Sequence, residues 1–172
     1  MFGLNFSKKD GVEAAVAEAV HEELSPWSGD ITKIKLFSRF TDDEKAQLLT
    51  LDLDIRHYPE GSIILDEGVP SAAFYVILEG KAGVYKLGFG DRITFLLKDQ
   101  VFGEIAFFTK RNTTTKVISE DRDTWVLRMD KHFMEKIDLE MRDKLKDKII
   151  DKLATIVENL NFKMVNQQRL SR

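Results

Sequence analysis

The spacing of apolar positions changes twice along the chain. Apolar residues recur at helical intervals over residues 11–24, with Asp10 as an N-cap and Pro26 shortly after the end. From Ile55 to Arg128 the pattern changes to short β-rich segments separated by turns, and after Met129 the helical interval returns. The pattern therefore predicts helices, then a β region, then further helices.

The β region contains six segments rich in β-branched and aromatic residues, and glycine-containing turns lie between them. The predicted strands are 62–65, 73–78, 82–86, 92–97, 114–119 and 124–128. Many short strands at this spacing are typical of an antiparallel sandwich or a small barrel.

Helix signals flank this region. Thr41 precedes Glu44 by three residues, which is the spacing of a capping box. Asp130 can cap a short helix that runs to Ile137, and a long charged helix follows from Asp138. Apolar residues mark one face of that helix: Leu145, Ile149, Leu153, Ile156 and Leu160, widened by Ile150 and Val157. This face either packs on its own domain or mediates homodimerisation.

Composition narrows the functional classes. The 172 residues, 43% of them hydrophobic, suit one domain with a real core, and the net charge of −3 offers no field for nucleic acid. The absence of cysteine excludes disulfides and thiolate metal sites and fits the cytoplasm. The longest apolar run, Ala72 to Leu78, is too short to span a membrane, and the first residues lack the order of a secretory signal.

Residues 99–115 interrupt the strands with a different chemistry. Gly103 permits a sharp turn, and Glu104 to Phe108 can form one helical turn whose free N–H groups suit an anion. The hydroxyl-rich run Thr113 to Thr115 could add donors.

Four motifs in fixed order carry a resemblance: Tyr58 to Ile64, Glu67-Gly68, Phe74 to Gly80, and Phe102 to Ala106. Together they resemble the cyclic nucleotide-binding domain, a family that includes catabolite-activator-type regulators, kinase regulatory subunits and gated channels. The resemblance implies a mainly β fold, in which an antiparallel jelly-roll barrel carries a phosphate-cassette helix, N-terminal helices and a long C-terminal helix that often dimerises. We expect a stand-alone domain divided into an N-terminal extension (1–33), the barrel with its cassette (34–137) and the C-terminal helix (138–172).

The resemblance also implies roles for the cassette. Glu104 matches the glutamate that takes the ribose 2′-hydroxyl, and the backbone amides of the cassette would hold the cyclic phosphate. The candidate ligand-binding residues are Phe102, Gly103, Glu104, Ile105, Ala106, Thr113 and Thr114. An ungapped match from Phe102 to Val117 places Thr113 where the family has its phosphate-binding arginine.

The missing guanidinium leaves alternatives. Lys110 or Arg111 could still contact an anion, although the register argues against Arg111, and both also fit a solvated basic loop. Glu104 could instead cap neighbouring backbone amides with no ribose present. A second departure is Asp99-Gln100, where the family usually has Gly-Asp; because Asp tolerates left-handed geometry, the fold need not suffer.

Other chemistries lack a site in the sequence. His21, His57 and His132 lie in different regions, so a metal enzyme is not expected, and no hydrolase, Walker or dinucleotide motif is present. Residues 138–172 leave no room for a helix-turn-helix, so DNA binding is not expected. The sequence predicts a non-enzymatic regulatory or sensor module that binds cAMP and cGMP weakly or not at all and signals to an unknown effector protein. The alternatives are a genuine sensor of cyclic nucleotide or another phosphate metabolite that uses Arg111 or Lys110, and a ligand-free dimerisation scaffold. No cofactor is expected.

Overall fold

The structure is a computed structural model that describes residues 27–170. The helix expected over residues 11–24 lies outside this range. The described chain begins with two 3-10 turns, η1 (Ile31–Lys33) and η2 (Lys35–Phe37), and the helix α2 (Asp42–Leu49). The predicted capping box of α2 is confirmed, because the Thr41 hydroxyl accepts from the Glu44 N–H at 3.2 Å and the Glu44 carboxylate accepts from the Thr41 N–H at 2.6 Å.

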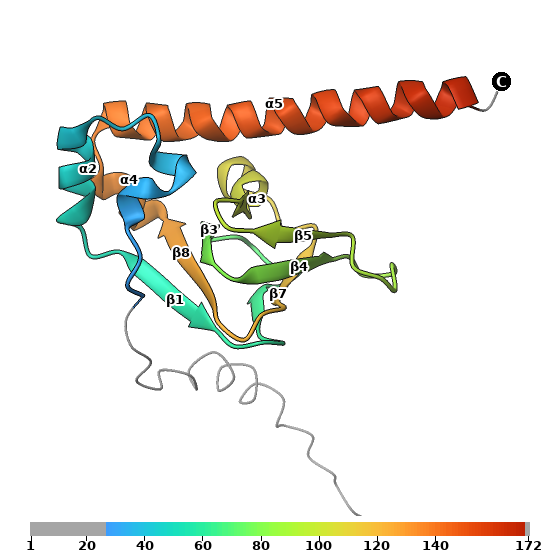
Figure 1. The fold of residues 1–172 in the computed structure, drawn as a ribbon, viewed down its shortest axis with the longest axis horizontal. Coiled ribbons are helices and arrows are strands. Elements are labelled where there is room, and N and C mark those ends of the chain that lie inside the picture. Colours follow the sequence, from blue (N-terminus) through green and yellow to red (C-terminus); the bar gives the residue numbers. More distant parts are fainter. Residues whose placement is uncertain (1–26, 171–172) are drawn as a thin grey trace, which may run out of the picture.

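Two four-stranded antiparallel sheets form the centre of the molecule (Figure 1). Their strands are β1 (Asp54–Tyr58), β2 (Ile63–Leu65), β3 (Ala73–Glu79), β4 (Lys81–Tyr85), β5 (Thr94–Leu97), β6 (Val101–Phe102), β7 (Lys116–Ser119) and β8 (Thr124–Asp130). The strand orders are β1-β8-β3-β6 and β2-β7-β4-β5, so the chain passes repeatedly from one sheet to the other and only β4 and β5 follow each other within a sheet. This topology confirms the jelly roll. In the described part of the chain no strand pairing closes these sheets into a barrel.

The strand predictions fail at two places. All six predicted segments contain strands, but β1 and β6 were not expected. β1 includes Asp54, Arg56 and His57 and so lacks an apolar alternation, and β6 consists only of Val101 and Phe102. Both strands exist because β8 and β3 offer paired backbone partners, which local sequence does not reveal.

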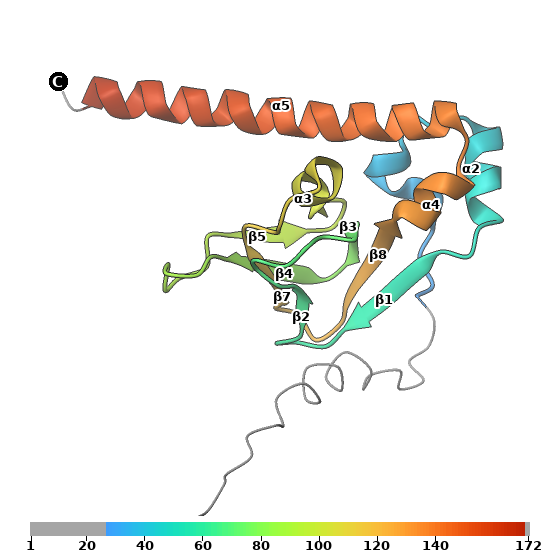
Figure 2. The same ribbon diagram turned by 180° about the vertical axis from the view of Figure 1, so that it is seen from behind.

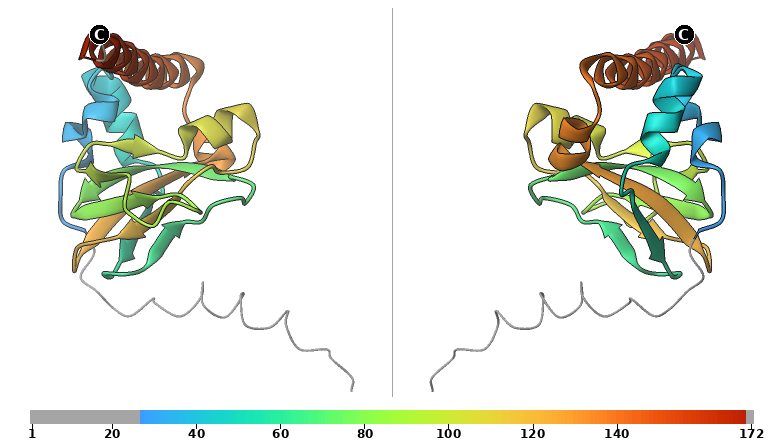
Figure 3. Two further views of the ribbon diagram at one scale, coloured as in Figure 1. Left: turned by 90° about the vertical axis from the view of Figure 1, so that its right-hand side faces the viewer. Right: turned by 90° about the vertical axis from the view of Figure 1, so that its left-hand side faces the viewer.

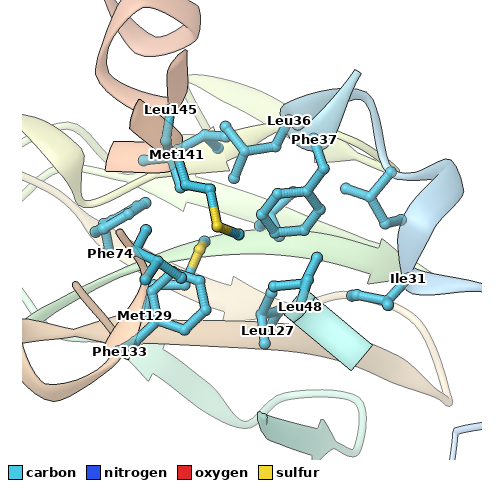
Figure 4. Packing of buried hydrophobic residues seen from close by; sticks show 14 of the residues in the cluster. Ile31, Leu36, Phe37, Leu48, Phe74, Leu127, Met129, Phe133, Met141 and Leu145 are labelled. Atoms are coloured by element: carbon cyan, nitrogen blue, oxygen red, sulfur yellow. The ribbon is translucent and has the colours of Figure 1, made fainter. Parts of the chain in front are cut away.

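Each sheet face builds part of the core. Phe74, Val76 and Leu78 of β3 belong to the larger cluster, together with Phe37 and Met141 of the helical part. Figure 4 shows Phe74 beside Met129 and Met141 in this cluster. The alternate residues Tyr75 and Ile77 join a second cluster between the sheets. Because both faces of β3 are covered, its first six residues are all buried.

The helix α3 (Glu104–Thr109) lies between β6 and β7, and two helices follow the last strand: α4 (Lys131–Lys136) and α5 (Leu139–Leu170). Asp130 caps α4 as predicted and accepts from the Phe133 N–H at 3.0 Å. α5 crosses over α3 and then continues past the sheets, as the opposite views show (Figures 1 and 2).

The apolar face of α5 divides into two halves. Leu145 and Ile149 are buried against the sheet, whereas Ile156 and Leu160 are 43% and 53% exposed. Seen nearly along its axis, α5 lies on the same side of the molecule as α2 and α3, and the strands lie on the other side of these helices (Figure 3). The first half thus packs on its own domain as one alternative predicted, and the second half has no cover among the described residues. Between residues 27 and 170 no helix is apolar over a stretch long enough to cross a bilayer.

Candidate functional site

The cassette begins where β6 meets α3. Gly103 has φ 76°, and this left-handed conformation turns the chain into α3 at Glu104, as the sequence predicts. Two aromatic residues hold α3 on the sheet, because the rings of Phe107 and Phe108 lie 5.1 and 5.5 Å from the Phe74 ring. The position of α3 is therefore fixed by core packing.

The Glu104 side chain is buried and paired. Glu104 as a whole is 4% exposed, and its Oε1 accepts a hydrogen bond from the Lys152 ammonium of α5 at 2.7 Å. Lys152 also donates to the Val101 carbonyl. Among residues 27–170, no neighbouring backbone amide donates a hydrogen bond to the Glu104 carboxylate. The alternative in which Glu104 caps such amides is therefore not found in the structure.

Sequence reasoning missed Lys152. It lies 48 residues after Glu104, on a helix that carries several other lysines. One signal was present: Lys148 and Lys152 lie one helical turn apart and flank Ile149, which belongs to the buried face. Lysines at that position point their ammonium groups along the edge of the buried contact.

Thr113 is directed into a loop contact. The residue is 5% exposed, its hydroxyl donates to the Asp66 carbonyl at 2.6 Å, and the same oxygen accepts from the Val69 N–H at 3.1 Å. Its backbone pairs with Gly68 and Val69, both at 2.9 Å. The residue in the arginine position therefore anchors the loop between β2 and β3.

The basic residues near the cassette divide into paired and free ones. Lys116 lies 3.0 Å from Asp66, and this hydrogen bond is the main cause that lowers the pKa of Asp66. Lys86 donates to the Thr114 carbonyl at 2.9 Å. Lys110 and Arg111 are exposed and make no side-chain hydrogen bond or ion pair within residues 27–170, which agrees with a solvated loop.

Side chains fill the space between the sheets. Tyr75 and Phe102 stack with ring centroids 5.2 Å apart and an interplanar angle of 15°. Both are in the second core cluster with Leu65 and Val117. Phe102 thus has the core-filling role that its sequence position also allows, while Ala106 is buried and Ile105 is 57% exposed.

Residues 55–138 match the family model of the cyclic nucleotide-binding domain. The resemblance predicted from the sequence motifs is confirmed over these residues. Regulatory subunits of cAMP-dependent protein kinase from Pyricularia oryzae and Aspergillus fumigatus are 26% and 28% identical over 90 residues. These matches cover 52% of this chain but only 23% and 22% of the two relatives, so the chain spans a small part of their length.

Solved structures share the fold of this cyclic nucleotide-binding domain. A domain from Methylobacillus flagellatus has a TM-score of 0.67 at 17% identity, with 79% of each chain covered. The catabolite activator protein of Thermus thermophilus has a TM-score of 0.63 at 18% identity, covering 75% of this chain and 61% of that one. The regulatory subunit of a cAMP-independent protein kinase A from Trypanosoma brucei has a TM-score of 0.60 at 19% identity, covering 81% and 47%.

The second departure from the family pattern is accommodated locally. Asp99 has φ 71°, the left-handed conformation that the sequence analysis allows for it. Its carboxylate accepts from the Lys35 N–H at 2.9 Å, and Gln100 accepts from the Leu97 N–H at 2.7 Å. These contacts stabilise the turn before the cyclic nucleotide-binding cassette without glycine.

Another cavity of the domain lies away from the cassette. It measures about 410 Å³ and lies between β1, β8 and α4. One of its cations, Arg128, already pairs with Asp54 at 3.0 Å and Asp130 at 2.9 Å, so that guanidinium offers no free charge to an anion. The described residues contain no cluster of three potential metal ligands. The cassette remains the better candidate because it holds the family motif.

Proposed function

We propose that this chain is a non-catalytic regulatory module of the cyclic nucleotide-binding type that binds cAMP and cGMP weakly or not at all. The observation that carries the proposal is the state of Thr113. A threonine in the arginine position offers no positive charge, and its hydroxyl is already engaged with Asp66 and Val69. The cassette therefore has no fixed guanidinium for a cyclic phosphate.

The remaining cations do not replace that group. Lys116 and Lys86 lie in ion pairs with Asp66 and Glu67, at 3.0 and 3.5 Å. Lys110 and Arg111 are exposed, so an anion held by them alone would remain largely hydrated. Hydrogen bonds to charged groups contribute about 1.5–3 kcal/mol, and the loss of a bidentate pair corresponds to roughly two decades in affinity.

The retained Glu104 supports the same proposal. Its carboxylate is held by Lys152, so a ribose hydroxyl would have to displace or share that ammonium. The similar structure from T. brucei is the regulatory subunit of a cAMP-independent protein kinase A, which is consistent with regulatory use of this fold without cAMP. We expect this module to act in the cytoplasm through an effector protein.

Calorimetric titration of the purified chain with cAMP and with cGMP tests the proposal. We expect dissociation constants of about 0.1 mM or weaker, or no heat of binding. Low-micromolar binding of either nucleotide would overturn it. In that case Arg111→Ala identifies the anchor, since loss of binding assigns the phosphate contact to Arg111 and unchanged binding excludes it.

A second candidate function, a dimerisation scaffold, is favoured by the outer half of α5. Ile156, Val157 and Leu160 lie on one side of the helix and are 43%, 54% and 53% exposed. The same side is continuous with the buried Ile149, so a second copy could extend the packed seam. In this function the interior filled by Tyr75 and Phe102 needs no ligand.

A further inference from the structure

A second cavity lies beside the cassette, where α5 crosses η2 and the turn before β6. It has a volume of about 160 Å³. Leu36, Val101 and Ile149 contribute its apolar wall, and these residues are only 3%, 5% and 4% exposed. A cavity of about 150 Å³ lined by apolar groups holds a molecule the size of benzene. The cleft therefore has room for a compact apolar group of a few carbons.

Three lysines, Lys35, Lys148 and Lys152, also line this cleft. Two of them have carboxylate partners: Lys35 lies 3.8 Å from Asp99, and Lys152 lies 2.7 Å from Glu104. Lys148 is half-buried and makes no hydrogen bond or ion pair with any residue in the described range. One lysine among the described residues thus borders the apolar wall without a counter-charge.

We propose that this cleft is a binding site for a small organic monoanion, a carboxylate on a short aliphatic chain. The aliphatic part would pack on Leu36, Val101 and Ile149, and the carboxylate would accept from Lys148 and Lys152. A single negative charge matches the one unneutralised lysine. A di- or triphosphate does not, because Asp99 lines the cleft and would repel the additional charge.

The site connects to the cassette through Lys152. The same ammonium donates to Glu104 and borders the cleft, so an anion bound there competes with Glu104 for its charge. Occupation of the cleft weakens the contact between α5 and the cassette. This coupling involves only the lysine and the glutamate, and it holds whether or not the cassette binds a nucleotide.

The site is tested by titrating the full chain with hexanoate and measuring binding by isothermal calorimetry and by amide NMR. Hexan-1-ol is the matched neutral probe, with the same chain and no charge. We expect saturable hexanoate binding that weakens as salt is added, and binding of hexan-1-ol weaker by at least about tenfold. The absence of saturable hexanoate binding, or equal affinity for both probes, would show that the cleft is not an anion site.

Substitutions of Lys148 test whether this lysine supplies the positive charge that binds hexanoate. Lys148→Met should weaken hexanoate binding by about tenfold or more, and Lys148→Gln serves as a second version in case the first is poorly folded. Lys146→Met is the matched control, because Lys146 is on the same helix but pairs with Asp143 at 3.2 Å. Equal affinities of the Lys148 and Lys146 variants would contradict the site. A hexanoate-dependent shift of the Glu104 amide supports the coupling, and its absence at saturation excludes it.

Discussion

The Lys152 ammonium lies 2.7 Å from a carboxylate oxygen of Glu104, and this contact joins the C-terminal helix to the cassette. The Glu104 side chain is 5% exposed, while that of Lys152 is 32% exposed. A carboxylate so far from water needs a counter-charge, and α5 supplies it from 48 residues away. In this structure the cassette glutamate, Glu104, therefore forms an ion pair with α5 of the same chain.

Removal of this ammonium should destabilise the domain. Lys152→Met leaves Glu104 buried without a cation, and we expect a loss of about 1–3 kcal/mol, the lower part of the range reflecting the partial exposure of the lysine. Urea denaturation of Lys152→Met, Glu104→Gln and the double variant gives the coupling energy, expected at about 1 kcal/mol. Lys163→Met, an exposed control on the same helix, should change stability by less than about 0.5 kcal/mol. Additive effects in the cycle would show that the pair contributes nothing.

The Thr113 hydroxyl should matter for stability rather than for a ligand. Thr113→Val keeps the shape but leaves the Asp66 carbonyl and the Val69 N–H without this partner. We expect a cost of about 1–3 kcal/mol in the free energy of unfolding, whereas Thr113→Ser, which keeps the hydroxyl, should cost less than about 1 kcal/mol. Chemical denaturation compares the two variants, and equal losses would mean that the hydroxyl bonds are unimportant.

Restoring the guanidinium should change affinity. Thr113→Arg should raise the affinity for cAMP or cGMP by at least about tenfold, because it supplies a charged, planar donor. It should also cost stability, since the new side chain leaves the loop contacts of Thr113. Calorimetry of Thr113→Arg beside Thr113→Val separates the two effects. An unchanged affinity in a folded Thr113→Arg protein would mean that the cassette is altered in more than one place.

Acid should weaken the link between α2 and α5. Burial would raise the pKa of Glu44, but hydrogen bonds from Lys144 and from the Thr41 N–H outweigh it, so the pKa of Glu44 lies below its usual 4.5. A depressed folded-state pKa means that this stabilisation is present above about pH 4.5 and is lost as the pH falls through the folded value. Glu44→Gln should therefore cost about 1–2 kcal/mol at about pH 7 and less at about pH 3.5.

The pH series has its own control on α2. Asp43 is exposed beside Glu44, and Asp43→Asn should cost less than about 0.5 kcal/mol at both pH values. A Glu44→Gln cost that stays the same at about pH 3.5 would contradict the assigned role of the carboxylate.

The outer half of α5 predicts an oligomeric state. If its apolar side pairs with a second copy, the wild-type chain should have twice the monomer mass in light scattering after gel filtration. The double variant Ile156→Glu/Leu160→Glu should then be monomeric, because two buried carboxylates oppose the seam. Asn159→Glu, on another side of the helix, should leave the mass unchanged. A monomeric wild-type chain at high concentration would exclude the scaffold function.

The local elements of the site were predictable because their signals are short in range. Gly103 followed by a helical turn, the caps at Thr41 and Asp130, and the left-handed tolerance of Asp99 all depend on a few adjacent residues. β6 was missed because two residues carry no period, and its place depends on pairing with β3.

The sequence by itself determined the family motif order, the exchange of the cassette arginine for Thr113, and the alternation of strands and turns that makes a jelly roll. Only the tertiary structure decided which partners these residues have: Glu104 meets Lys152, and Thr113 meets the loop at Asp66 and Val69. The physical reason is that many residues of the chain could bond to a given charged or hydroxyl side chain. The packing of the elements determines which of them lies within hydrogen-bond distance. The burial of Leu145 and Ile149 fixes the rotation of α5 and thereby brings one lysine of several to the cassette.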